Sequence, residues 1–264
     1  MKKKLFLNFI LIVLVSIFLS GICYSSFHIL TWMKDNKETT KQIHEVQDLV
    51  VIEEHPPEVV ADVVVEDAIH TEEKLIGVDF APLLEKNPEV VGWIQVKGTN
   101  INYPFVQHTD NKYYLKKSLD RTYNSAGWVF LDYRNSTTDL DQNTIIYAHG
   151  RVDGTMFGTL KNTLNREWFD HSENHILKIS TPFYNYVFEV FSIYHIKTTD
   201  DYLYTNFIND EQYMNFIDLI TSRSAYKFPT VVGPTDKILT LSTCYNSTEK
   251  MVLHAKLTMC ENRN

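Results

Sequence analysis

The sequence has 264 residues, of which 44% are hydrophobic and 13% aromatic, enough to bury a core in one large domain or two small ones. Its net charge of −8 is spread unevenly. Residues 1–42 carry six lysines and two acids, residues 43–73 carry ten acids and no lysine or arginine, and the rest is close to neutral. No segment has the basic character of a nucleic-acid-binding face, so a nucleic-acid partner is not expected.

The N-terminus begins with a short basic tail, followed by an almost wholly apolar stretch over residues 5–24. About 20 such residues span a bilayer, so we predict that residues 1–33 are an uncleaved anchor that inserts into the lipid bilayer. The alternative is a cleaved signal peptide, but its apolar region is usually only about 7–15 residues long and no A-x-A site follows. A lipoprotein signal at Cys23 is disfavoured by the bulky Ile22 before it. Lysines flank the stretch on both sides, so charge leaves the orientation open, while the short tail favours an extracellular domain.

Residues 34–73 have the composition of a spacer. They contain "EEHPPEVVADVVVEDAIHTEE", with paired prolines, scattered valines and unopposed acids that repel one another. We therefore expect an acidic extracellular stalk over 34–73 and a folded domain over 74–264.

Beyond residue 74, short runs rich in Val, Ile, Tyr and Phe alternate with turn residues, which is typical of β-strands. The predicted strands are 90–96, 100–107, 127–132, 143–149, 175–180, 185–196, 237–244 and 250–259. The predicted helices are 79–87, 110–118, 155–164 and 209–224, the last with apolar residues on one face. This pattern indicates one mainly β (α+β) domain, a barrel decorated with helices.

Two residues stand where strands end. His149 closes the predicted strand 143–149, and Cys244 closes 237–244. If 237–244 pairs with 250–259 as an antiparallel hairpin, Cys244 lies opposite Lys250 and Thr240 lies opposite His254. His254 is then about 13 Å along the strand from Cys244, which makes it a poor base for the thiol although it is closer in sequence than His149.

A cysteine at a strand end can also be an inert thiol or half of a disulfide. Cys23 lies in the apolar stretch, so only Cys244 and Cys260 could pair within the domain. A secreted structural domain with that bridge is one alternative interpretation.

The sequence resembles the class B sortases over roughly residues 78–259. "TLSTC" followed by "MVLHAKL" resembles the catalytic end of these enzymes, and the other matching segments come in the expected order. They are "VVGWIQVKGTNINYPFVQ", "DNKYYL", "GWVFLDYRN", "NTIIYAH" and "TMFGTL". The resemblance implies an eight-stranded sortase barrel, a membrane-anchored N-terminus and cysteine transpeptidase activity outside the cell, with no cofactor and no metal.

The resemblance also implies roles for individual residues. Cys244 is the expected nucleophile, and His149 is the group that protonates the leaving amine. The family carries an arginine where this sequence has Lys250, after a longer loop. Lysine keeps the positive charge but lacks the planar fork of donors, so we expect reduced rather than abolished activity.

The expected partners are secreted proteins with a C-terminal sorting signal, of the NP-x-T-x or related P-x-T-x kind, and a peptidoglycan-precursor or pilin amine as acceptor. A degenerate sortase that binds a sorting peptide with little turnover is the alternative that Lys250 suggests. By position, the peptide groove is expected to be lined by Asn111, Leu115, Tyr147, Thr198, Tyr202, Leu203, Ser242 and Thr243.

Overall fold

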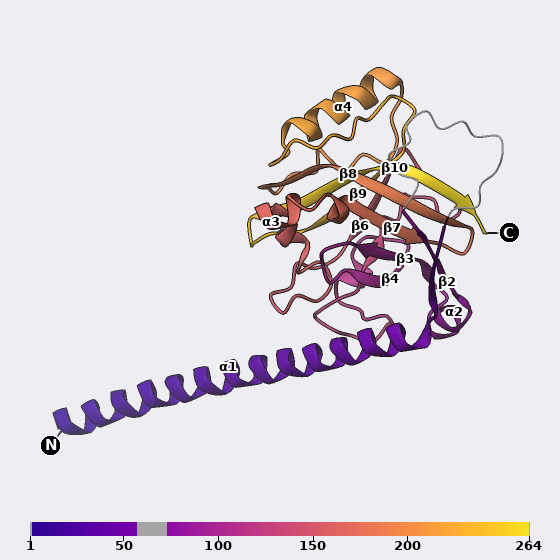
Figure 1. Cartoon of the computed structure of the whole chain (residues 1–264). Helices are drawn as coiled ribbons and strands as arrows, with labels where there is room; N and C mark the ends of the chain where they lie inside the picture. Colours follow the sequence, from indigo (N-terminus) through magenta and orange to yellow (C-terminus); the bar gives the residue numbers. More distant parts are fainter. Residues whose placement is uncertain (1, 57–72, 264) are drawn as a thin grey trace, which may run out of the picture.

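Eight strands close into a barrel in the computed structural model, which describes residues 2–56 and 73–263. They are β3 (Val90–Val96), β4 (Asn102–Val106), β5 (Phe130–Leu131), β6 (Asn143–Tyr147), β7 (Ile176–Ser180), β8 (Tyr184–Lys197), β9 (Ile238–Cys244) and β10 (Glu249–Asn262). Each falls on a segment predicted as a strand, and the predicted eight-stranded barrel is confirmed (Figure 1).

Neighbouring strands follow the order β10–β8–β7–β3–β4–β5–β6–β9, and β9 closes the ring on β10. The pairs β4–β5 and β6–β9 are parallel, whereas the remaining pairs are antiparallel. Alternate residues of each strand fill the barrel with large apolar side chains such as Trp93, Phe188 and Leu241. Because β6 and β9 run in parallel, their C-terminal ends lie at the same end of the barrel.

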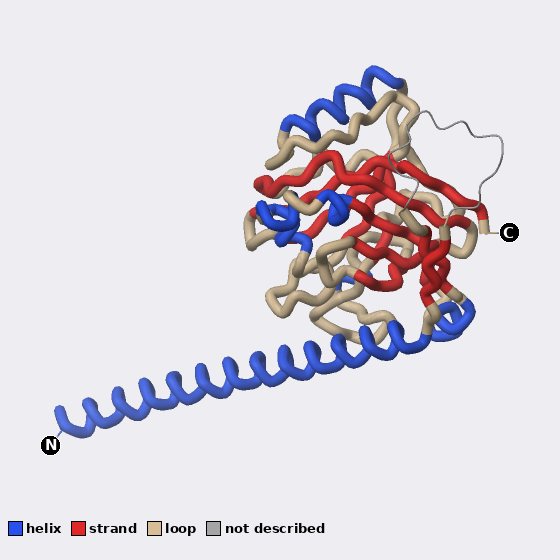
Figure 2. The backbone as a smooth tube through the Cα atoms, in the orientation of Figure 1, coloured by secondary structure: helices blue, strands red, loops and turns tan. Residues whose placement is uncertain are grey.

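Short helices connect and cover the strands (Figure 2). They are α2 (Ala81–Lys86), η1 (Tyr113–Leu115), η2 (Leu160–Leu164), α3 (Arg166–Phe169), η3 (Ser172–His175) and α4 (Asp210–Ser222). The amphipathic helix predicted over 209–224 is α4, which begins at an Asn209 N-cap and buries Tyr213 and Phe216 against residues of β8, β9 and β10.

Two helical predictions are too long. Of 110–118 only η1 is helical, and of 155–164 only η2. In the second case Gly154 and Met156 have positive φ, and Gly150 pairs with Met156, so residues 150–158 form a tight loop instead of a first helical turn.

The N-terminal helix α1 (Lys2–Leu49) continues far beyond the predicted anchor. An extended spacer is predicted from residue 34, but residues 34–49 are helical. Six residues from 35 to 50 are buried against the barrel at helical spacing: Asp35, Thr39, Gln42, Ile43, Val46 and Val50. The acidic composition hid this period, although Glu45 and Asp48 are exposed and only Asp35 among the acids of this part is buried.

After α1, β1 (Ile52–His55) pairs with β2 (Leu75–Val78) in a small two-stranded sheet. Residues 57–72, which include the centre of the predicted stalk, lie outside the described residues. The division of the chain at residues 33 and 73 therefore stays a prediction.

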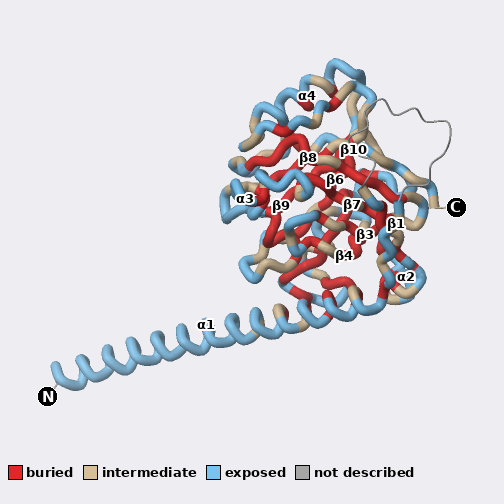
Figure 3. Tube along the Cα trace, viewed as in Figure 1, coloured by how far each residue is buried: buried red, intermediate tan, exposed pale blue. Residues whose placement is uncertain are grey.

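The first part of α1 extends away from the barrel, with its apolar side chains exposed (Figure 3). By length and composition, α1 is apolar enough to cross a membrane.

The alternative with a disulfide is wrong. Cys244 and Cys260 are both free. Cys244 pairs with Lys250 on β10, so Cys260 lies ten residues farther along that strand, roughly 33 Å away.

Candidate active site

Cys244 is the last residue of β9 and is exposed to solvent. The β9–β10 register pairs it with Lys250, as the hairpin arithmetic predicts. Directly paired residues project to the same face of a sheet, and the Lys250 Nζ lies 3.3 Å from the Cys244 Sγ, close enough to donate a hydrogen bond. A cationic group thus stands beside the exposed thiol.

His149 is brought to the same end of the barrel by the parallel pairing of β6 with β9, in which Tyr147 lies opposite Ser242. Two contacts continue this register beyond the strand. The Thr243 hydroxyl donates to the Ala148 carbonyl at 2.7 Å. Gly150 packs so tightly that a methyl group on its Cα would lie 2.1 Å from the Cys244 carbonyl oxygen. The backbone on both sides of His149 is therefore fixed against the segment that carries Cys244.

The imidazole of His149 is held by Leu115 and Gly127, which precede it in the chain. Its Nε2 lies 2.8 Å from the Leu115 carbonyl, and because a carbonyl can only accept, Nε2 carries the proton. Gly127, with a positive φ, packs against the ring, since a Cβ on it would lie 3.1 Å from the His149 Cδ2. The tautomer leaves Nδ1 as the nitrogen that can take up or give back a proton.

His254 cannot act as the base or acid for Cys244. It is fully buried, and its two ring nitrogens contact the Thr240 and Tyr194 hydroxyls at 2.8 and 2.9 Å. Burial, with a smaller contribution from the positive charge of Arg223, lowers its pKa to about 3. His254 is a neutral structural residue.

Several of the expected groove residues meet around the buried carboxylate of Asp132. Asn111 Nδ2 and the Tyr147 hydroxyl each donate to Asp132 Oδ2 at 2.9 Å. Arg134 donates to both carboxylate oxygens, from Nε at 2.9 Å and from Nη2 at 2.7 Å. The same Nη2 also donates to the Leu203 carbonyl at 2.9 Å, which links this cluster to the segment after β8.

Burial would raise the pKa of Asp132, but hydrogen bonds from Arg134, Tyr147 and Asn111 outweigh it and lower the pKa. Asp132 is therefore a carboxylate that fixes the donors around it. Asp132 is not among the site residues predicted from the sequence, although the segment "GWVFLDYRN" contains both Asp132 and Arg134. An acid two residues before an arginine at a strand end is the signal that was available.

Two more expected groove residues lie together near the end of β9 that carries the thiol. The Tyr202 and Ser242 hydroxyls are 2.9 Å apart, and both side chains are buried. The Thr243 side chain is buried too and already donates to Ala148, so it acts in holding the strand ends together.

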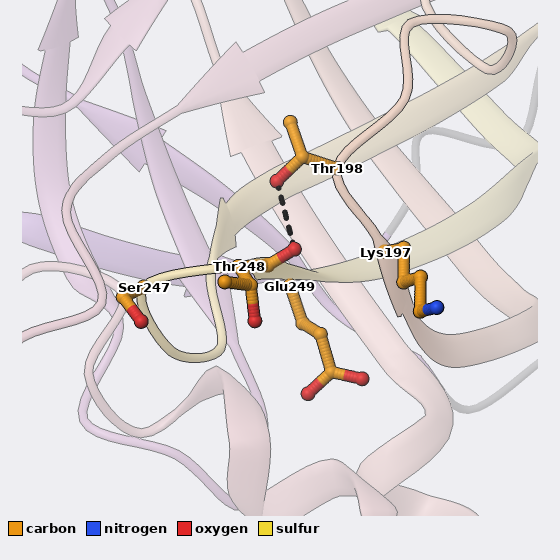
Figure 4. A pocket seen from close by; sticks show the side chains of 5 residues that line it. All are labelled: Lys197, Thr198, Ser247, Thr248 and Glu249. Atoms are coloured by element: carbon orange, nitrogen blue, oxygen red, sulfur yellow. Dashed lines mark hydrogen bonds between the residues drawn. The ribbon is translucent and has the colours of Figure 1, made fainter.

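Thr198 lies apart from the cluster around Asp132. It follows β8, and its N–H and hydroxyl both donate to the Thr248 carbonyl, at 3.0 and 3.1 Å. Together with Lys197, Ser247, Thr248 and Glu249 it lines an open hollow beside the β9–β10 turn (Figure 4). Strand alternation turns Glu249 away from the face that carries Lys250 and Cys244, so this hollow flanks the thiol without opening onto it.

In the part of the chain that the structure describes, no three His, Cys, Asp or Glu side chains are placed to hold a metal ion. What the strand ends assemble is an exposed thiol, a lysine ammonium and a histidine held in one tautomer, beside a cluster of fixed hydrogen-bond donors. This combination is suited to acyl transfer through a cysteine.

Comparison with known proteins agrees with this chemistry. Residues 94–258 match the sortase family, described as the Sortase domain. Sortase B of Staphylococcus aureus is 35% identical over 182 residues, which cover 67% of this chain and 74% of that protein. Its solved substrate complex superposes with a TM-score of 0.64 at 34% identity, over 68% of this chain and 84% of that one.

The crystal structure of sortase B from B. anthracis in complex with AAEK1 gives a TM-score of 0.71 at 35% identity. It covers 86% of this chain and 99% of that one, so the similarity extends beyond the matched domain. The chain belongs to the sortase family of transpeptidases, and within that family to class B.

Proposed function

We propose that this sortase is a membrane-anchored cysteine transpeptidase acting outside the cell, with Cys244 as the nucleophile. It would cleave a C-terminal sorting signal of the NP-x-T-x or related P-x-T-x kind after the threonine. The threonine acyl group, held on Cys244, would then be transferred to a cell-wall or pilin amine. The observation that carries the proposal is the placement of the Cys244 thiol, the Lys250 ammonium and the His149 loop at one end of the barrel.

In the first half of the reaction, the Cys244 thiolate attacks the carbonyl carbon of the threonine, and the bond from that carbon to the next nitrogen breaks. Protonated His149 gives its Nδ1 proton to the leaving amine, while Nε2 keeps its proton on the Leu115 carbonyl. The product is a thioester between Cys244 and the threonine. In the second half, an acceptor amine attacks the thioester, His149 takes the proton, and the thiolate leaves.

Lys250 would stabilise the negative charge that develops on the threonine carbonyl oxygen. Its ammonium lies 3.3 Å from the Cys244 sulfur, so it stands beside any carbonyl that the sulfur attacks. Losing an oxyanion donor costs about 2.7–4 kcal/mol in well-studied enzymes, and a retained ammonium should lose less than that relative to arginine.

The cluster around Asp132 would bind the sorting peptide. Arg134 uses Nε and Nη2 for Asp132 and Leu203, and within the described residues its Nη1 has no hydrogen bond. Its side chain is 39% exposed, so these remaining donors are available to peptide carbonyls. The solved S. aureus relative described as a substrate complex supports a peptide substrate of the same class.

Thioester trapping tests the proposal against the alternative of a degenerate sortase that binds without turnover. Incubating the full chain with a sorting peptide should give a mass adduct on Cys244 that equals the peptide up to its threonine. Cys244→Ala should give none. Binding of the peptide to the wild type without any adduct would favour the degenerate sortase.

The role of Lys250 is tested by comparing two replacements. We expect Lys250→Ala to lower kcat at least tenfold, because the charge is lost. Lys250→Arg should retain or raise kcat. If the alanine variant were as active as the wild type and arginine brought no gain, Lys250 would have no part in the reaction.

A further inference from the structure

The last part of α1 is packed against the barrel through polar as well as apolar side chains. Ile43 and Val46 are buried in the manner of an ordinary amphipathic helix, but Asp35, Thr39 and Gln42 on the same face are also buried. Buried polar groups are stable only when they are hydrogen-bonded, so the partners of these residues show what this part of α1 fixes in place.

The first partner is the loop at 116–126. Asp35 Oδ2 accepts from the backbone N–H of Ser125 at 3.1 Å and also from its hydroxyl. The buried Asn124 side chain donates to the Thr39 hydroxyl at 3.1 Å and to the Asp35 carbonyl at 3.3 Å. Two residues after Ser125 comes Gly127, which packs on the His149 ring.

The same loop also controls the carbonyl that holds the imidazole. The Asn124 N–H donates to the Lys116 carbonyl at 3.1 Å, and Trp128 donates to the Tyr114 carbonyl at 2.9 Å. These two bonds enclose Leu115, whose carbonyl binds the His149 Nε2. Only two contacts therefore connect Asp35 to the His149 ring: Asp35 binds Ser125, and Gly127, two residues later, packs on the ring.

The second partner is the loop that follows His149. Arg151, two residues after it, donates to the Asn36 side chain on α1. The guanidinium also donates to Asp153 Oδ2 at 2.8 Å and to the Thr155 hydroxyl at 2.9 Å, which closes the loop on itself. The Arg151 side chain is only 10% exposed, so this contact is part of the packed interface.

We propose that Asp35 and Asn36 are positioning residues for the sortase reaction. They lie next to each other on α1 and hold the loop that leads to Gly127 beside the His149 ring and the loop that follows His149 in the chain. The helix that begins as the apolar N-terminal segment thus completes the catalytic site. The inference rests on the proposed function, because it gives the position of His149 a catalytic consequence.

The expected signature is a loss in kcat with little change in KM. Misplacing a reacting group by about 1 Å can cost about 100-fold in rate. The expected groove residues Asn111 and Tyr147 are held by Asp132 instead of α1, so peptide binding should survive.

The test uses the full chain in detergent with a fluorogenic sorting peptide. The double variant Asp35→Ala/Asn36→Ala should lower kcat at least tenfold and leave KM within twofold. Val46→Ala is the matched control, since Val46 is fully buried on the same helix face but lies about 15 Å farther along α1. It should lower the melting temperature while kcat stays within twofold. Asp35→Asn, which keeps an acceptor oxygen for Ser125, should restore at least half of the kcat lost in Asp35→Ala.

Unchanged kcat in the double variant would overturn the inference, and so would an equal loss in Val46→Ala. If the double variant does not fold, Asn36→Ala alone removes only the Arg151 contact and gives the same comparison. His149→Ala distinguishes a failure of the proposed function from a failure of the positioning role. If it is as active as the wild type, the proposed function fails. If it is inactive while the α1 variants are fully active, only the positioning role fails.

Discussion

Replacing Gly150 by alanine should disable the site with little disturbance elsewhere. The added methyl group would lie 2.1 Å from the Cys244 carbonyl oxygen and 3.0 Å from the Thr243 hydroxyl. A Cβ essentially never approaches another atom closer than 3.0 Å, and here the nearest atom is backbone that cannot rotate away. The loop after His149 must therefore move about 1 Å from β9. A displacement of that size predicts a fall in kcat of about 100-fold.

The assay is steady-state turnover of a sorting peptide by the full chain, with thermal melting measured in parallel. Overpacking costs typically about 1–3 kcal/mol, so we expect a lower melting temperature but a folded protein. Gly233→Ala is the control, because the nearest atom to its added methyl group is the Asp236 carboxylate at 3.5 Å, an ordinary contact. A folded Gly150→Ala protein with kcat within threefold of the wild type would refute the claim that this close approach sets the position of His149 relative to Cys244.

Two further predictions concern buried charge. Asp132→Asn should raise KM at least tenfold and change kcat less, since a neutral amide cannot hold all the donors that meet at this carboxylate. Asp139→Asn is the control: it breaks an ion pair with Lys237 in which the Asp139 side chain is 71% exposed, so it should change neither KM nor kcat. His254 should make the fold sensitive to acid. Its pKa is about 3 in the folded protein and about 6.5 in the unfolded chain. Between these values the unfolded chain binds a proton that the folded protein does not. Stability should fall by about 2 kcal/mol from pH 7 to pH 5 through this residue, and chemical denaturation of His254→Gln should show a smaller fall; equal pH dependence in both proteins would contradict the assignment.

The barrel could be predicted because its information is local. Strands such as β3 and β9 are apolar and β-branched runs that are buried along most of their length, and turn residues separate such runs in the sequence. The hairpin register followed from the length of the β9–β10 connection alone. It placed Lys250 opposite Cys244 and moved His254 away from the thiol, as the structure has them.

What the sequence did not reveal depends on contacts between distant segments. Asp132 is one acid among 33 acidic residues, and only the fold brings Asn111, Arg134 and Tyr147 around it. The docked part of α1 was hidden for a similar reason. Its buried face is half polar, so apolar periodicity is weak, and its polar members have their partners 78 to 90 residues away.

The two departures from the class B pattern are best understood together. A lysine ammonium is a compact charge on a flexible stem, whereas an arginine reaches with a broad planar fork. The short connection over residues 245–249 pairs residue 250 directly with Cys244, so a point charge at this position already lies 3.3 Å from the sulfur. A longer loop would move that residue out of register and would require a side chain that reaches back toward the thiol. If Lys250 has the proposed role, the shorter turn would remove the need for the arginine's reach, and the lysine would supply the charge at close range. On this argument Lys250→Arg in the present short turn should bring only a modest gain, and lengthening the turn should harm the lysine enzyme more than the arginine variant.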